Sequence, residues 1–130
     1  MPWELRDQEY KAVLQLSPED RYGYCLRHIA DEERVWSLWQ DGWALLGTDD
    51  GTEVVPIWPH SRYAEACTVE DFSGYQARAI SLQDWLDRWI PGMVRDRRLV
   101  AVFLTPDGQG PVVTPHEIES DLRAELAQYE

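Results

Sequence analysis

Asparagine is absent from this 130-residue chain, lysine occurs once, and only two cysteines are present. Asparagine and lysine use A/T-rich codons, so their scarcity indicates a G+C-rich, bacterial gene. Two cysteines do not form the disulfide framework of a small secreted domain, so we expect a reduced, cytoplasmic protein with Cys25 and Cys67 as buried thiols. The sequence leaves open whether these two cysteines form a disulfide. The sequence shows no basic-plus-apolar leader. The length of its apolar runs does not approach the roughly 18 residues of a membrane span.

Positive charge is also scarce. The 12 lysines and arginines are outnumbered by 24 aspartates and glutamates, which gives a net charge of −12. Nucleic acids and anionic membranes both need a cationic surface, so neither is expected as a partner. An acidic surface is typical of a soluble protein, and it also favours attraction to a basic protein.

Catalytic, metal-binding and cofactor-binding motifs are missing. His28, His60 and His116 lack metal-ligand spacing, and no serine lies in a nucleophile elbow. The Asp49-Asp50-Gly51 segment is expected to be a hairpin turn and not a calcium loop. The glycine-rich segment 107–110 lies between strands, without the helix N-terminus that binds phosphate. We therefore predict no metal and no cofactor, and favour a non-enzymatic protein.

Strand-forming aromatic residues are plentiful between Val35 and His60, where four of the seven tryptophans lie. Two Asp-Gly turns separate apolar runs in this stretch, which predicts a β-meander over about 34–58. Pro56 predicts that its third strand is an edge strand or carries a bulge. The apolar run 99–104 and the short run 111–113 predict a C-terminal hairpin over about 99–114.

Helical periodicity surrounds these strands. Ser17 and Pro18 open a helix that runs to about Asp31, preceded by a weak helix that ends near Leu16. Further helices are predicted at about 59–67, from Ser81 until Pro91-Gly92 stops the helix, and from Thr114 to the C-terminus. Together with a short strand at 76–80, these elements predict a single α+β domain over 1–130, with a mostly antiparallel sheet and helices packed on it.

Several short motifs occur along the chain in a fixed order. They are Asp41-Gly42-Trp43-Ala44-Leu45, Pro56-Ile57-Trp58-Pro59, Tyr63-Ala64, Gly74-Tyr75, Trp89-Ile90-Pro91-Gly92 and Phe103-x-Thr105-Pro106. Taken together, these motifs resemble a family of small bacterial cytoplasmic proteins known as domain of unknown function 2750. The similarity runs from about Leu16 to Tyr129, with Phe72-Ser73 where the pattern often has tryptophan before Gly74-Tyr75. The resemblance implies no catalytic or binding residues.

The tryptophans raise one geometric question. Trp36 and Trp39 fall on opposite faces of one strand because side chains alternate. Either both faces of the sheet are covered, or one indole is exposed as an anchor for a partner. Trp43 and Trp58 raise the same question, whereas a helical stripe predicts that Trp85 and Trp89 face the core.

Two polar features have alternative interpretations. His60 is either a general base or ligand, with Tyr63 one turn away, or a hydrogen-bond partner for the start of the next helix, which we favour. The basic patch of arginines either accepts an acidic partner or a phosphate, or pairs with the protein's own carboxylates, which is again favoured. Its members are Arg88, Arg95, Arg97 and Arg98.

These observations favour a non-enzymatic acidic protein-binding module, adaptor-like or immunity-like, of a bacterial cytoplasm, with a basic protein as partner. The alternative is a small-ligand-binding protein or enzyme with a pocket near Trp43, Trp58, His60 and Tyr63. A third interpretation is a homodimer through the 111–113 edge or an exposed tryptophan face. The candidate binding residues are Trp36, Trp39, Trp43, Trp58, His60 and Tyr63.

Overall fold

The computed structural model describes residues 4–69, 72–107 and 110–128, and it confirms the α+β class. Within these residues no helix combines the length and apolar character needed to cross a bilayer. The elements in chain order are α1 (Asp7–Leu14), α2 (Pro18–Glu32), β1 (Arg34–Trp39), β2 (Leu46–Gly47), β3 (Glu53–Ile57), α3 (Ser61–Glu65), β4 (Gln76–Ser81), α4 (Leu82–Asp84), the π-helical segment η2 (Trp85–Trp89), α5 (Ile90–Asp96), β5 (Leu99–Val102), β6 (Val112–Val113) and α6 (Pro115–Ala127).

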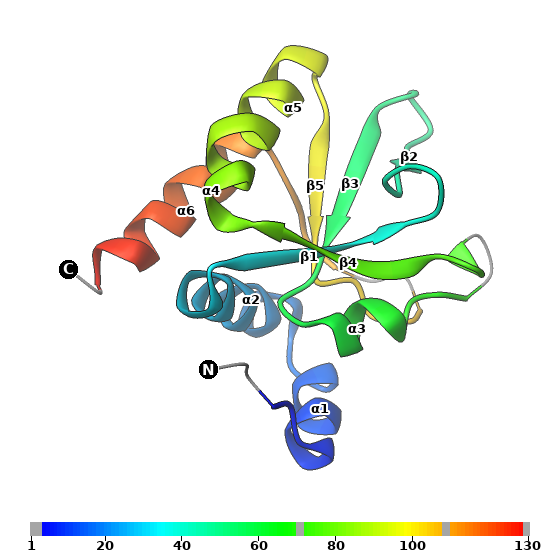
Figure 1. Cartoon of the computed structure of the whole chain (residues 1–130), viewed down its shortest axis with the longest axis vertical. Helices are drawn as coiled ribbons and strands as arrows, with labels where there is room; N and C mark the ends of the chain where they lie inside the picture. The colour runs from blue at the N-terminus through cyan, green and yellow to red at the C-terminus, as the bar shows by residue number, and fades with distance from the viewer. Residues whose placement is uncertain (1–3, 70–71, 108–109, 129–130) are drawn as a thin grey trace.

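The strands form two groups that cross each other (Figure 1). β1 and β4 make an antiparallel ribbon, and a second sheet has the order β2-β3-β5-β6. Helices α2 and α3 lie on one side of the ribbon, and the α4–α5 segment lies on the other. Helices therefore lie on both sides of β1, and its two tryptophans, Trp36 and Trp39, are both half-buried.

A pair of tryptophans joins the two groups. The Trp36 N–H donates to the Trp58 carbonyl at 3.0 Å, and the Trp58 N–H donates back to the Trp36 carbonyl at 2.8 Å. One residue further along β1, the buried Ser37 hydroxyl donates to the Pro56 carbonyl at 2.7 Å. These bonds connect the ribbon to the end of β3.

The predicted meander forms only in part. β2 and β3 make the expected hairpin, but β1 pairs along its length with β4 instead. β3 lies in parallel with β5, which the long connection between them allows, since a parallel pair needs a crossover and not a tight turn. The C-terminal hairpin of β5 and β6 forms as predicted. The exposed Val112 lies on the edge strand β6, where a homodimer contact stays a prediction.

Pro56 lies inside the sheet and not in an edge strand, which corrects one expectation. Its carbonyl points toward Ser37 and away from β5, and in an extended strand the nitrogen of the same residue points the same way. The ladder with β5 therefore loses no donor at Pro56. Because β2 pairs with β3 only at Glu53 and Val54, no ladder hydrogen bond is lost on that side either.

The helix that begins at Leu82 does not stop at Pro91-Gly92 as predicted. Ile90 donates its N–H to the Trp85 carbonyl, five residues back, and the chain continues as α5 to Asp96. Pro91 has no N–H to offer the Asp87 carbonyl, so a regular α-helical ladder is interrupted at this point in any case. A π-turn just before the proline absorbs that interruption and lets the helix continue.

The helix caps predicted at Ser17, Ser81 and Thr114 are confirmed, whereas the cap of α3 is His60 and not Ser61 as predicted. Ser17 accepts from the Asp20 N–H at 3.2 Å, and Ser81 accepts from the Asp84 N–H at 3.1 Å. Thr114 and Glu117 form a reciprocal capping box at the start of α6. Each cap satisfies a backbone donor that the first helical turn leaves without a partner.

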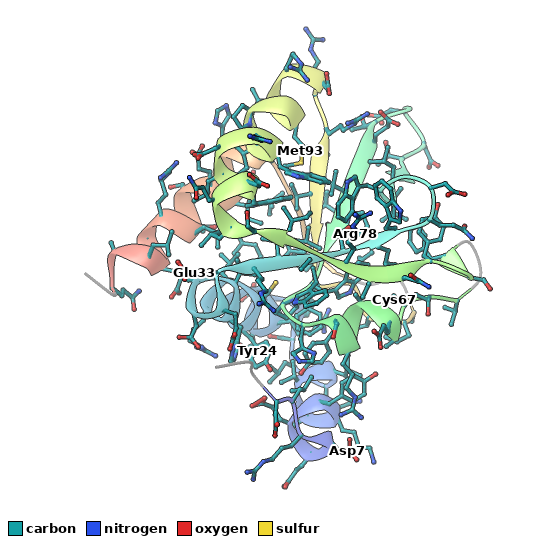
Figure 2. The ribbon with its side chains drawn as sticks, viewed as in Figure 1. Asp7, Tyr24, Glu33, Cys67, Arg78 and Met93 are labelled. Carbon is teal, nitrogen blue, oxygen red and sulfur yellow. The ribbon has the colours of Figure 1, made fainter. Side chains whose placement is uncertain are left out.

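The core is one cluster of apolar side chains that extends to both sides of the β1–β4 ribbon. Met93 and Cys67 lie on opposite sides of the ribbon in Figure 2, and both are buried. Cys25 and Cys67 are free thiols, as expected for a reduced protein. Burial raises the pKa of Cys67 to about 11 and raises the pKa of Cys25 further.

These buried thiols predict a loss of stability at alkaline pH. A thiol in the unfolded chain ionises near pH 8.5 to 9, whereas the folded chain keeps both thiols protonated until a higher pH. Their contribution is therefore complete below about pH 8.5 and is lost as the pH rises through the folded-state values. We expect the free energy of unfolding, measured in urea, to fall by about 2 kcal/mol between about pH 9 and pH 10.

The matched control is the double variant Cys25→Ala, Cys67→Ala. Its stability at neutral pH is lower because of lost packing, but its pH dependence over the same interval should be much flatter. If the free energy of unfolding falls with pH equally steeply in the two proteins, the thiols do not titrate as the structure implies.

Candidate functional site

Four tryptophans form a row from the core to the surface, which we call the tryptophan cluster: Trp39, Trp43, Trp85 and Trp89. The rings of Trp39 and Trp43 meet edge to face at 5.1 Å, and those of Trp43 and Trp89 at 5.0 Å. Trp89 is in turn 5.7 Å from Trp85. Trp85 is fully buried, and the other three are half-buried, so the row ends at the surface.

Local backbone geometry brings these rings together. Asp41 adopts a left-handed φ of 55°, and the Gln40 N–H donates to the Gly42 carbonyl at 2.9 Å. This tight turn returns Trp43 beside Trp39 as an antiparallel bridge. On the opposite wall, the π-helical segment carries Trp89, and such segments occur frequently at functional sites.

Arg78 completes the surface end of the cluster. Its guanidinium carbon lies 4.4 Å from the ring centre of Trp39 and 5.7 Å from that of Trp43. In the β1–β4 ribbon Arg78 stands opposite the small residue Ser37, which leaves room for the side chain to lean over the neighbouring indole. A cation over a tryptophan ring at this distance is a favourable contact.

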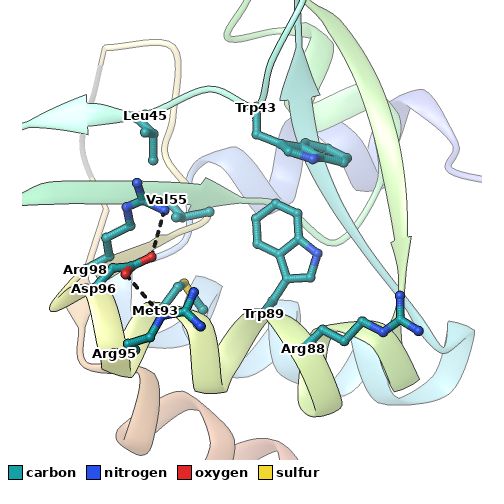
Figure 3. Close-up of a pocket in the computed structure, with 10 residues that line it drawn as sticks. Trp43, Leu45, Val55, Arg88, Trp89, Met93, Arg95, Asp96 and Arg98 are labelled. Carbon is teal, nitrogen blue, oxygen red and sulfur yellow. Dashed lines mark hydrogen bonds and ion pairs between the residues drawn. The ribbon is translucent and has the colours of Figure 1, made fainter.

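A groove of about 370 Å³ is lined in part by Trp43 and Trp89, and we call it the arginine groove. In Figure 3 the two indoles lie between Arg88 at one end and Arg95 with Arg98 at the other. The rest of its lining is mostly apolar and comes from β3, α5 and the chain before β2. These lining residues are Leu45, Val55, Gly92, Met93 and Asp96.

The arginines of this groove are already paired with the protein's own carboxylates, as the sequence favoured. Arg98 contacts Glu53 at 3.1 Å and Asp96 at 3.6 Å, and Arg95 contacts Asp96 at 3.4 Å. The side chains of Arg95 and Arg88 are 78% and 81% exposed. Exposed ion pairs contribute only about 0–1 kcal/mol each, so these two can exchange partners at small cost.

A second groove, of about 340 Å³, is lined in part by the same two indoles, and we call it the strand groove. Arg78 and Trp39 line it together with the end of β4 and Asp84 of α4. Trp43 and Trp89 therefore form a ridge between two surface depressions. This arrangement suits the binding of an extended partner across the ridge, because indoles supply large contact area with few rotatable bonds.

The sequence-predicted tryptophans have different surroundings. Trp39 and Trp43 belong to the cluster, whereas Trp36 packs against the core. Trp58 is completely buried, and its Nε1 donates to the Leu104 carbonyl at 2.9 Å. Trp85 is buried in the core as predicted. Trp89 also packs against the core as predicted, and in addition it lines both grooves.

His60 and Tyr63 lie in another part of the molecule, beside α1. The His60 Nδ1 accepts from the Arg62 N–H at 3.0 Å, which confirms the favoured interpretation that it bonds the start of α3. Tyr63 is buried, and its ring stacks on that of Tyr10 with the ring centres 5.2 Å apart. The hydroxyl oxygen of Tyr63 lies 3.3 Å from that of Tyr24.

Tyr63 and Tyr24 are held in their neutral form by burial. Burial raises the pKa of Tyr63 to about 12. Burial and the hydrogen bond with Tyr63 raise the pKa of Tyr24 above its ordinary value as well. Neither phenol is therefore available as a base. A salt bridge of 2.7 Å from Arg62 to Asp7 helps to fix α1 over them.

Sequence reasoning missed the central role of Trp89 and did not consider Arg78. A signal for Trp89 was present, because it lies inside the arginine-rich stretch that follows Asp87. No comparable local signal marks Arg78, whose neighbour Trp39 is distant in sequence. No group of three or more metal-ligating side chains was found among the described residues.

The fold and the site define an α+β protein whose surface carries an indole ridge bordered by arginines. The chain belongs to the family described as protein of unknown function (DUF2750), whose model matches residues 22–122. The match begins inside α2, so α1 lies outside it. Comparisons with curated proteins and with solved structures found no match.

Proposed function

We propose that this chain is a non-enzymatic protein-binding module of a bacterial cytoplasm, adaptor-like or immunity-like, and that the partner docks on the tryptophan cluster. One observation carries the proposal. Trp43 and Trp89 meet edge to face at 5.0 Å and separate two surface grooves. Partly exposed indoles beside arginines are the side chains that most often dominate protein interfaces.

The surroundings of the ridge support a binding role. Trp39 and Trp43 are held by backbone bridging and by contact with Arg78, so little side-chain freedom is left to lose on association. The free thiols of Cys25 and Cys67 are compatible with a reducing compartment. The arginine-rich, asparagine-free composition supports a bacterial origin.

The proposal is tested with a partner captured from a lysate of the source cell, identified, purified and titrated by calorimetry. We expect Trp39→Ala to weaken that complex at least tenfold, the loss typical of an interface residue worth more than about 1.4 kcal/mol. Trp39 lies outside the set of side chains that pack against the core, so this variant should stay folded.

Trp36→Ala is the matched control, because Trp36 is also a half-buried indole of β1 but points to the opposite face. We expect it to lower thermal stability and to leave the affinity of the folded fraction unchanged. Equal losses of affinity in Trp36→Ala and Trp39→Ala would contradict docking on the tryptophan cluster.

A small-ligand-binding role is the second candidate. The arginine groove has a volume of about 370 Å³, which falls within the range of small-molecule sites. Its Trp43 is the one residue of the sequence-predicted pocket that lines it. This candidate predicts that a metabolite extract, freed of proteins, quenches the tryptophan fluorescence of the wild type and not that of Trp43→Phe.

A further inference from the structure

The arginine groove combines an apolar wall with cationic ends. Leu45, Val55 and Met93 face the groove together with the ridge indoles, and Leu45 is 38% exposed. Arg95 and Arg98 lie at one end (Figure 3), and Arg88 lies at the other. A segment that enters this groove therefore meets apolar contact in the middle and positive charge beyond it.

The charge inside the groove is opposite to that of the whole molecule. Three arginines line it, and Asp96 is its single acidic lining residue, although the chain carries a net charge of −12. At physiological ionic strength charges are screened beyond about 8 Å. Contacts made within the groove therefore depend on its three arginines and on the carboxylates that already contact them, Asp96, Glu53 and Asp84, whereas the distant acidic residues mainly slow the encounter.

The carboxylates that contact these arginines use only part of the arginines' hydrogen-bonding capacity. Asp96 is shared between Arg95 and Arg98 at 3.4 and 3.6 Å, so one carboxylate serves two guanidinium groups. Arg88 has one ion-pair contact within the described part of the chain, a long one of 3.8 Å with Asp84. Each arginine can bind a carboxylate through two parallel hydrogen bonds, and this capacity is incompletely used here.

We infer that the arginine groove binds an acidic segment of a partner protein in which a large apolar side chain stands next to carboxylates. The apolar side chain packs among Trp43, Leu45 and Met93, and the carboxylates pair with Arg95 and Arg88 at the two ends. This inference rests on the proposed binding function and adds the chemistry of the partner, which is the opposite of the basic partner suggested by net charge.

The test uses four synthetic hexapeptides, blocked at both ends, titrated into the full chain while tryptophan fluorescence is followed. One contains phenylalanine with glutamates on both sides of it, the second replaces the glutamates by glutamines, the third replaces them by lysines, and the fourth replaces phenylalanine by alanine. We expect the first to bind at least about tenfold more tightly than each of the others, and its affinity to fall as salt is raised.

Matched charge variants locate the binding. Arg88→Gln with Arg95→Gln removes two exposed positive charges at the groove and should weaken the acidic peptide at least about tenfold. Arg27→Gln with Arg123→Gln removes the same charge from α2 and α6, and should change the affinity by less than about twofold. Equal effects of the two double variants would overturn the inference.

The remaining outcomes separate this inference from the proposed function. Tighter binding of the lysine or glutamine peptide overturns the inference and leaves a protein partner on the ridge intact. Phenyl phosphate binding as tightly as the acidic peptide overturns it in favour of a small anionic ligand. If no peptide binds, the inference fails, and the calorimetric comparison of Trp39→Ala with Trp36→Ala still decides the proposed function by itself.

Discussion

Replacement of Trp58 by alanine is expected to lower the free energy of unfolding by about 3–5 kcal/mol. The Trp58 side chain is completely buried, so its removal leaves a cavity in addition to the lost transfer free energy. The Leu104 carbonyl also loses its indole donor, although the Cys67 thiol still lies 3.3 Å from that oxygen. Since domains of this kind are stable by about 5–15 kcal/mol, the variant should be only marginally folded.

Two phenylalanine variants separate packing from hydrogen bonding. Trp58→Phe removes the donor to Leu104, whereas Trp85→Phe removes a buried indole N–H that has no hydrogen-bond acceptor among the described residues. Both indoles are fully buried, so the loss of volume is similar. We expect Trp58→Phe to be about 1 kcal/mol more destabilising than Trp85→Phe, because only the first breaks a satisfied hydrogen bond.

Urea unfolding followed by far-ultraviolet circular dichroism measures these differences without relying on the replaced fluorophores. Equal destabilisation by the two phenylalanine variants would mean that the Trp58–Leu104 bond adds nothing to stability beyond packing.

Phe103→Ala is the second substitution with a large expected effect, again about 3–5 kcal/mol. Phe103 is completely buried, and its ring lies 4.6 Å from that of Tyr63. Its backbone is also unusual for a phenylalanine, with a left-handed φ of 59°. The chain bends here directly after β5, where the Phe103 N–H donates to the Ile57 carbonyl at 2.8 Å.

This backbone conformation reverses the usual order of alanine and glycine. Left-handed geometry costs an L-residue about 1–2 kcal/mol and costs glycine little. We therefore expect Phe103→Gly to be about 1 kcal/mol less destabilising than Phe103→Ala in the same urea experiment.

Ile90 supplies the control for this comparison, because it is buried in ordinary helical geometry with φ of −63°. At residue 90, replacement by glycine should destabilise the fold by about 1 kcal/mol more than replacement by alanine. If glycine is also worse than alanine at residue 103, the left-handed conformation of Phe103 is not maintained in solution.

Features that depend on a few neighbouring residues could be predicted from the sequence. The caps at Ser17, Ser81 and Thr114 were predicted because a hydroxyl reaches the N–H three residues ahead. His60 was expected to bond the start of the next helix, and it does so two residues ahead. The β2–β3 hairpin followed from its Asp-Gly turn.

Strand pairing could not be predicted in the same way. β1 and the β2–β3 hairpin are close in the chain, and the apolar pattern of β1 is compatible with either neighbour. β1 pairs with β4 instead. Such a choice depends on the total burial of all alternatives, which no local window contains.

The sequence by itself determined the α+β class, the positions of most helices and strands, the acidic charge and the tryptophan-rich strand where the site begins. Only the tertiary structure decided that Trp89 meets Trp43 and that Arg78 covers Trp39. It also decided that Arg88, Arg95 and Arg98 border one groove. Propensity, capping and turn formation are local free energies, whereas the Trp43–Trp89 and Trp39–Arg78 contacts join residues about 40 positions apart. Their formation depends on how the whole chain buries its apolar surface.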